Sequence, residues 1–266
     1  MSKLVAPLQK SGIEAGKPES SKPVQVVQYS PGRSGSTMLY QVLTHLGTEV
    51  QKTHEWSEIF AKVVITYRHP CDVFCSFFRI SRDLDGDDDL QTALRQGWNP
   101  TVWWTLFQGL RYVRKGYSQL QKYLDSNMEI CLLRYERFKD DYEYLFDRLA
   151  SFLPLSIDRA MRDRIEDATS FSKNKVLTAA YTSFKEFDQN TLLHGKHLGS
   201  GAAGQWRYVC PAWMRHFLER MLAPELTLYQ SLADRYDAPS PARKRMQHRD
   251  GQQPLSDQAT PRHRAA

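Results

Sequence analysis

Twice along this chain, an apolar stretch with strand composition runs directly into a short basic turn and then into a helical pattern. The first unit passes from Val24–Tyr29 through the turn Ser30–Thr37 into a helical pattern, and the second passes from Lys62–Tyr67 through Arg68 into a helix that begins at Pro70. Each turn would aim backbone N–H groups, a helix N-terminus and a guanidinium at one anion. The repetition indicates a ligand with two separated phosphate-like groups.

Strands and helices are predicted to alternate over the rest of the chain. A long helix should begin after Pro100, another apolar strand spans Met128–Arg134, and an amphipathic helix spans Asp140–Leu153. This order predicts an α/β fold, a three-layer sandwich with a central, mostly parallel sheet flanked by helices and a P-loop-like turn. Ligands of such sheets bind at the carboxyl ends of the strands, where both basic turns fall.

Three later segments complete the predicted organisation. Residues 82–89 are acidic and contain a Gly, which predicts a loop. Residues 170–206 are polar and Gly-rich, which predicts a long loop that covers a site. A final amphipathic helix should run from residue 211 to about residue 233.

The two ends of the chain differ in composition from its middle. Residues 1–23 lack apolar periodicity and residues 238–266 are rich in Pro and basic residues, so we predict a disordered leader, one domain over 24–237 and a disordered basic tail. The tail carries +4 of the net charge of +6, so the domain is close to neutral and no nucleic-acid partner is expected.

The apolar runs and the cysteines indicate the cellular compartment in which we expect the protein. No run is long enough to span a bilayer, the N-terminus lacks a signal-peptide core, and the four cysteines lack metal-ligand spacing. We therefore expect a soluble, cytoplasmic protein without a transmembrane segment, with buried reduced thiols.

The first turn differs from the P-loop of NTPases. No Lys precedes Ser36 and Thr37, and the Gly spacing does not fit, so hydrolysis of magnesium-bound nucleoside triphosphates is disfavoured. The turn keeps a cluster of backbone N–H groups, two hydroxyls and a fixed cation at Arg33. By itself it fits a purely steric corner as well as an anion site.

Four segments of the chain match, in order, the motifs of one enzyme family. They are the turn Ser30–Thr37, the segment Lys52-Thr53-His54, the pair Arg68 and Ser76, and a final set made of Tyr135-Glu136, Thr169-Ser170-Phe171 and Gly201-Ala202-Ala203-Gly204-Gln205-Trp206. Together they resemble sulfotransferases that use 3′-phosphoadenosine 5′-phosphosulfate (PAPS) as sulfuryl donor. The resemblance covers about Val24 to Leu232, and the ordered set is far more specific than any one piece.

The resemblance implies a role for each matching residue. His54 would take the proton of the acceptor, and Lys52 and Arg33 would stabilise the charge on the departing 5′-phosphate. The residues implied to bind the nucleotide are Arg33, Ser34, Gly35, Ser36 and Thr37 at the 5′-phosphosulfate, Arg68 and Ser76 at the 3′-phosphate, Tyr135, Thr169 and Phe171 at the adenine, and Ser200 and Gly201 at the end motif. The product would be adenosine 3′,5′-bisphosphate (PAP), and no metal is implied.

The chain departs from the family pattern at three places. Met38 stands where cytosolic members carry a Trp that stacks on adenine. Gly199-Ser200 replaces an Arg-Lys pair that holds the 3′-phosphate, and the basic residues at 196–197 are candidates to compensate. Only 21 residues separate Arg33 from His54, fewer than in steroid- and phenol-sulfating members, which predicts a more open acceptor site.

We expect the acceptor to be a small molecule that offers a hydroxyl or an amine. The acidic loop would place negative charge near the mouth of the site through Asp83, Asp85, Asp87, Asp88 and Asp89. Our hypothesis is therefore a polar or cationic natural product such as a guanidinium alkaloid, with a solvated loop unrelated to substrate as an equal alternative. Trp98, Trp103, Trp104 and Phe107 fit helix packing, with one or two of them lining the acceptor pocket.

Two other functions stay open at this point. A nucleotide kinase-like phosphoryl transferase could use the same strand-turn-helix framework, but the missing P-loop Lys argues against it. A non-catalytic nucleotide-binding scaffold would have no use for His54 and Lys52 opposite the leaving group.

Overall fold

The computed structural model describes residues 24–56, 62–96, 99–195 and 198–236. Within them, the sheet has four strands in the order β2-β1-β3-β4, all parallel. The strands are β1 (Gln25–Tyr29), β2 (Glu49–Thr53), β3 (Lys62–Tyr67) and β4 (Ile130–Arg134). The predicted leader 1–23 and tail 238–266 lie outside the described residues, so the domain boundaries stay a prediction.

Both faces of the sheet are buried. On one face, Val27 and Ile65 belong to an apolar cluster with the helices that cover that side. On the other face, their neighbours Val26 and Val64 belong to a second cluster. Because successive strand residues point to opposite faces, two covered faces explain why these strands are continuous apolar runs in the sequence.

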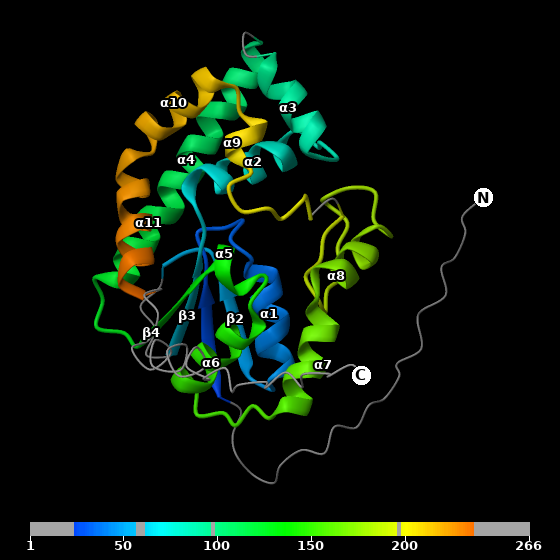
Figure 1. Ribbon diagram of the computed structural model, residues 1–266, viewed down its shortest axis with the longest axis vertical. Helices are drawn as coiled ribbons and strands as arrows, with labels where there is room; N and C mark the ends of the chain where they lie inside the picture. The colour runs from blue at the N-terminus through cyan, green and yellow to red at the C-terminus, as the bar shows by residue number, and fades with distance from the viewer. Residues whose placement is uncertain (1–23, 57–61, 97–98, 196–197, 237–266) are drawn as a thin grey trace, which may run out of the picture.

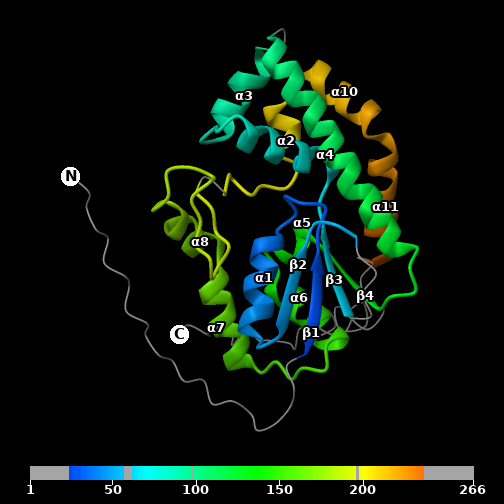
Figure 2. The same cartoon turned by 180° about the vertical axis from the view of Figure 1, so that it is seen from behind.

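Two layers of helices form these clusters (Figures 1 and 2), which confirms the predicted α/β sandwich. The Val26 face packs against α1 (Ser36–His45), α5 (Tyr135–Phe138), α6 (Tyr142–Phe152) and α7 (Arg159–Thr169). The cluster on the Val27 face includes residues of α2 (Pro70–Ser81), α3 (Asp87–Arg95), α4 (Pro100–Leu124), α9 (Trp206–Val209), α10 (Ala212–Met221) and α11 (Ala223–Tyr236). Helix α8 (Phe171–Thr178) contacts its neighbour α7, and Nδ2 of its Asn174 donates a hydrogen bond to Oε1 of Gln41 on α1 at 3.0 Å.

Three loop and helix predictions were wrong in part. The acidic segment is a loop only to Gly86, because Asp87 begins α3 and carboxylates stabilise the first turn of a helix. The segment 170–206 contains α8, whose N-terminus is capped by the hydroxyl of Ser170. The last helix is divided at Leu222, because Pro224 has no N–H to continue α10 and suits the first turn of α11.

Two further expectations concern the whole described chain. No helix in the described ranges is long and apolar enough to cross a membrane. All four cysteines are buried free thiols, as predicted.

Candidate active site

The parallel sheet brings the predicted site residues to one edge. Tyr29, the last residue of β1, is paired with Thr53 on β2 and with Ile65 on β3, and β3 ends beside the end of β4. The turn Ser30–Thr37, His54, Arg68 and Tyr135 follow these four strand ends directly, so they meet at the carboxyl edge. The sequence prediction that both basic turns lie at one edge is confirmed.

The first turn is a tight corner in the left-handed region of backbone space. Gly32, Arg33 and Gly35 have φ values of 79°, 54° and 81°. A Cβ on Gly32 would lie 1.8 Å from Oη of Tyr112, and one on Gly35 would lie 2.6 Å from the ring of Tyr135, so both positions require glycine. The first turn of α1 has neither an acidic residue nor a side-chain cap, so its N-terminus is arranged to receive an external anion.

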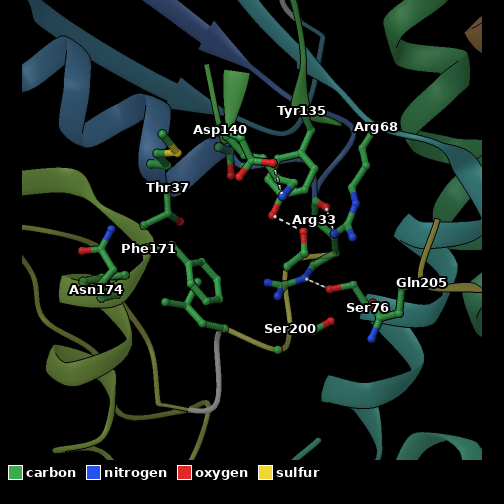
Figure 3. A pocket seen from close by; sticks show the side chains of 18 of the residues that line it. Arg33, Thr37, Arg68, Ser76, Tyr135, Asp140, Phe171, Asn174, Ser200 and Gln205 are labelled. Carbon is green, nitrogen blue, oxygen red and sulfur yellow. Dashed lines mark hydrogen bonds and ion pairs between the residues drawn. The ribbon is translucent and has the colours of Figure 1, made fainter. Parts of the chain in front are cut away.

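A cavity of about 250 Å³, here called the first cavity, collects most of the predicted nucleotide-binding residues. Its lining includes Arg33, Gly35, Ser36, Thr37, Arg68, Ser76, Tyr135, Thr169, Phe171, Ser200 and Gly201. Figure 3 shows Arg68 and Ser76 at one end of this cavity and Phe171 and Asn174 at the other. Residues from strand ends, helices and the segment before α9 therefore meet around one space.

Ser34 is the exception among the predicted nucleotide-binding residues. Its hydroxyl lies 3.3 Å from the carbonyl oxygen and 3.0 Å from Oγ1 of Thr66, and its side chain is fully buried. The side chain therefore fixes the turn to β3 and does not line the cavity. Only its backbone could contact a ligand.

The two basic turns are joined directly. Nε of Arg33 donates a hydrogen bond to Oγ of Ser76 at 3.1 Å (Figure 3), and Nη1 of Arg68 lies 3.4 Å from the carbonyl oxygen of Arg33. The guanidinium of Arg68 stacks over the ring of Tyr135 at 4.5 Å. Its Nε is buried and has no hydrogen-bond partner among the described residues, so this cation retains a donor. A single group can thus be bound from both turns.

The segment before α9 is attached to the second turn. Nη2 of Arg68 donates to the carbonyl oxygen of Ala202 at 3.1 Å, and the buried carboxylate of Asp72 accepts the N–H groups of Gly204 at 2.7 Å and Trp206 at 3.0 Å. These bonds place the end motif over the first cavity.

A second cavity of about 270 Å³ adjoins the first. The two share Arg33, Ser36 and Thr37. The lining of the second adds Gly32, Lys52, His54, Phe77, Ile80, Ser81, Tyr112, Phe184 and His194. Arg33, Ser36 and Thr37 of the first turn therefore form the junction of the two cavities, and the predicted base, His54, lines the second one.

The contacts of His54 define which nitrogen can act as a base. Nδ1 lies 3.1 Å from the carbonyl oxygen and 3.1 Å from the hydroxyl of Ser30. A carbonyl oxygen only accepts, so this bond requires a proton on Nδ1 and leaves Nε2 of the neutral ring with its lone pair. Burial, aided by Lys52 and Arg33, lowers the pKa of His54 below its ordinary value. The neutral form is thereby favoured near pH 7.

Cations gather where the two cavities meet. Nζ of Lys52 donates to Oγ1 of Thr37 at 3.2 Å, and burial together with Arg33 lowers the pKa of Lys52 to about 8. Burial is also the main reason that the pKa of Arg33 falls to about 10, with Arg79 and Arg68 adding repulsion. Buried like charges at one junction favour the binding of an anion there.

Several residues of the two cavities were missed by sequence reasoning. Arg79 and Asn174 line the first cavity, and Tyr112, Phe184 and His194 line the second. Arg79 is a helix residue one turn beyond Ser76, and that position was the available signal. The others belong to segments without a motif.

Other residues singled out from the sequence lie elsewhere. No residue of 83–89 lines either cavity, and neither do Trp103, Trp104 and Phe107. Trp104 and Phe107 are exposed, at 63% and 51%. Trp98 and the candidate basic residues at 196–197 lie outside the described residues. Within the described ranges, no group of three His, Cys, Asp or Glu side chains could hold a metal ion.

Known proteins were compared with the chain by sequence and by structure. The family model of the sulfotransferase domain matches residues 34–228. No curated protein matches the sequence significantly. The fold is similar to that of the mouse sulfotransferase SULT7A1, whose crystal structure is a complex with PAP, with a TM-score of 0.54 and 17% identity over 76% of this chain and 86% of that one. Since the family model covers most of the chain, this protein belongs to the sulfotransferase family.

Proposed function

We propose that this protein transfers a sulfuryl group from PAPS to a hydroxyl or an amine of a small molecule. The observation that carries the proposal is the junction of the two cavities at Arg33, Ser36 and Thr37. The guanidinium of Arg68 lines the cavity on one side of this junction, and the imidazole of His54 lines the cavity on the other side. A donor in the first cavity and an acceptor in the second would meet at this junction.

The donor is proposed to lie along the first cavity. Its 5′-phosphosulfate would accept hydrogen bonds from the turn Ser30–Thr37 and the N-terminus of α1. Its 3′-phosphate would face Arg68, whose planar fork suits a phosphate, and Ser76. The adenine would lie at the far end, against Phe171 and near Thr169. Phe171 is 41% exposed, so a base has a ring face on which to stack.

The reaction follows from the same placement. The acceptor oxygen or nitrogen attacks sulfur in line with the bridging oxygen, a new bond to sulfur forms, and the bond from sulfur to the 5′-phosphate oxygen breaks. Nε2 of His54 takes the acceptor proton as the bond forms. The electron pair leaves with PAP, whose new charge is stabilised by Arg33, Lys52 and the N–H groups of the turn.

The acceptor is expected to meet aromatic walls. The rings of Phe77 and Tyr112 stack at 4.6 Å on one side, and those of Phe184 and His194 stack at 4.4 Å on another. The lining described for this cavity contains no carboxylate. A cationic acceptor such as a guanidinium alkaloid is therefore proposed to bind through ring faces, which also accept neutral aromatic rings.

Transfer of sulfur label tests the proposal. The protein is incubated with sulfur-labelled PAPS and a panel of neutral phenols, neutral alcohols and cationic alcohols or amines. We expect labelled product from at least one class. A parallel incubation uses ATP labelled at its γ-phosphate. Transfer of that label alone would favour the phosphoryl transferase, and nucleotide binding without any transfer would favour the scaffold. A clear preference for phenols over cations would exclude the cationic acceptor.

The 3′-phosphate assignment has its own measurement. Arg68→Ala removes the fork and should weaken the binding of PAP about 10- to 100-fold, because hydrogen bonds to charged groups are worth about 1.5–3 kcal/mol. The affinity for adenosine 5′-monophosphate (AMP), which lacks the 3′-phosphate, should change much less. Equal losses for both nucleotides in calorimetry would refute the assignment.

Location and partners are proposals as well. We propose a cytoplasmic enzyme whose four thiols stay reduced, because all of them are buried and free. We propose no nucleic-acid partner, because the chain outside the basic tail is close to neutral.

A further inference from the structure

Arg79 is a buried cation in the first cavity to which no family motif assigns a role. It lies on α2, one helical turn beyond Ser76, and is only 2% exposed. It lines the same cavity as Arg68 and Ser76. Arg68 and Arg79 repel each other, and burial is the main cause that lowers the pKa of Arg79. Two guanidinium groups held close together in a desolvated wall favour an anion between them.

The backbone opposite Arg79 is fitted to its side chain. A Cβ on Gly199 would lie 3.1 Å from Nε and 3.3 Å from Cζ of Arg79, closer than most side chains tolerate. Gly199 also lines the first cavity. The chain thus has a glycine where the family pattern has an arginine, and the guanidinium of a neighbouring helix occupies the adjoining space. This wall of the cavity therefore carries a positive charge that comes from Arg79 on α2.

The acidic segment supports this arrangement. Nη1 of Arg79 donates to the carbonyl oxygen of Leu84 at 3.4 Å, and the charges of Asp87 and Asp85 oppose the lowering of its pKa. Asp87 also accepts hydrogen bonds from Gln205 and, at 3.3 Å, from Oη of Tyr208. This segment therefore holds the Arg79 side chain in place beside the first cavity.

We propose that Arg79 binds the 3′-phosphate of the donor together with Arg68 and Ser76, and so supplies the cation that Gly199-Ser200 lacks. The inference rests on the proposed function, since it assumes a 3′-phosphorylated nucleotide in the first cavity. It assigns the acidic segment to the donor site, as the support of Arg79, and not to the acceptor.

The test is nucleotide selectivity measured by calorimetry. The unmodified protein should bind PAP more tightly than AMP. Arg79→Met keeps the apolar stem and removes the fork, and should weaken PAP binding about 10- to 100-fold while AMP affinity changes little. Arg79→Lys keeps the charge beside Asp85 and Asp87 and should show an intermediate loss, because an ammonium lacks the planar fork. It also tests the inference if Arg79→Met does not fold.

A matched control separates local contact from overall charge. Arg82→Met removes one positive charge from the residue that follows α2 and lines neither cavity, so it should leave the preference for PAP intact. An undiminished preference in both Arg79 variants, or an equal loss of PAP and AMP binding, would overturn the inference alone. Failure of the unmodified protein to bind PAP would overturn the proposed function with it.

Discussion

The two cavities have the same junction but are built in different ways. The first is lined by residues that follow strand ends and by short motifs, so its parts are recognisable along the sequence. Apart from the first turn and the segment Lys52–His54, the second takes its walls from α2, from α4 and from residues 184 and 194, which are far apart in the chain and belong to none of the matching motifs. A donor common to a family can be held by a recurring set of residues, whereas acceptors differ, and their walls can vary without disturbing the sheet.

The cavities also differ in their charge. Arg33, Arg68 and Arg79 contribute three guanidinium groups to the first cavity. Beyond the shared Arg33, the second has a lysine, two imidazoles and the three aromatic rings of Phe77, Tyr112 and Phe184. We therefore expect substitutions in the first cavity to change nucleotide binding and substitutions in the second to change turnover or acceptor binding.

The largest difference between the effects on turnover and on nucleotide binding should come from His54→Ala. Loss of a general base lowers turnover by about 10²- to 10⁴-fold, while PAP affinity should be retained because His54 does not line the first cavity. Steady-state rates with labelled PAPS and calorimetry with PAP measure the two effects. His216→Ala, on an exposed face of α10, is the control and should behave like the unmodified protein. Turnover that survives in His54→Ala would place the base elsewhere.

The pH dependence of kcat/KM tests the roles of His54 and Lys52 at the junction. The rate should fall with acid below the pKa of His54, which is lower than 6.5, because the base becomes protonated. It should also fall as pH rises through about 8, because Lys52 loses its charge. Each limb should approach a tenfold change per pH unit beyond its pKa. Lys52→Arg should remove the alkaline limb for an acceptor that does not titrate in this range. An unchanged limb would show that deprotonation of Lys52 does not cause it.

The smallest effect is expected from the aromatic wall of the second cavity. Phe184→Leu removes a ring stacked on His194 and should raise the KM of the acceptor about 2- to 10-fold, the value of an aromatic pair, with PAP affinity unchanged. Phe187→Leu is the matched control: that ring also stacks on His194, at 4.9 Å, but does not line the cavity. Equal effects of the two variants would show that only the packing of His194 matters.

Much of the donor site could be predicted because its residues are local to strand ends. The strand Lys62–Tyr67 and the start of α2 at Pro70 coincide with the structure, and the residues after them point to the expected edge. Continuous apolar runs and an N-terminal proline are strong local signals. Ser34 shows the limit of a motif, since its membership in the loop does not reveal that its hydroxyl bonds Thr66.

The rest depends on contacts that a linear pattern does not encode. In the sequence, Arg79 has the features of an ordinary helix residue. Its role depends on its contact with Gly199, which is far away along the chain. Helix α8 was missed because its apolar residues, Phe171, Val176 and Leu177, do not recur at helical spacing. The acidic segment was linked to the acceptor from charge alone, with a solvated loop as an equal alternative. In the structure, Asp85 and Asp87 act on the pKa of Arg79, and Asp87 accepts a hydrogen bond from Gln205.

The hydrogen bond between Arg33 and Ser76 has a consequence for inhibitors. These two side chains bond to each other, so a compound that engages either of them must first replace that bond. Small fragments that reach only one end gain little from the exchange, because the displaced partner is left in need of a new one. Compounds with two linked anionic groups replace both partners at once, which makes them the better starting point for a selective drug-like blocker.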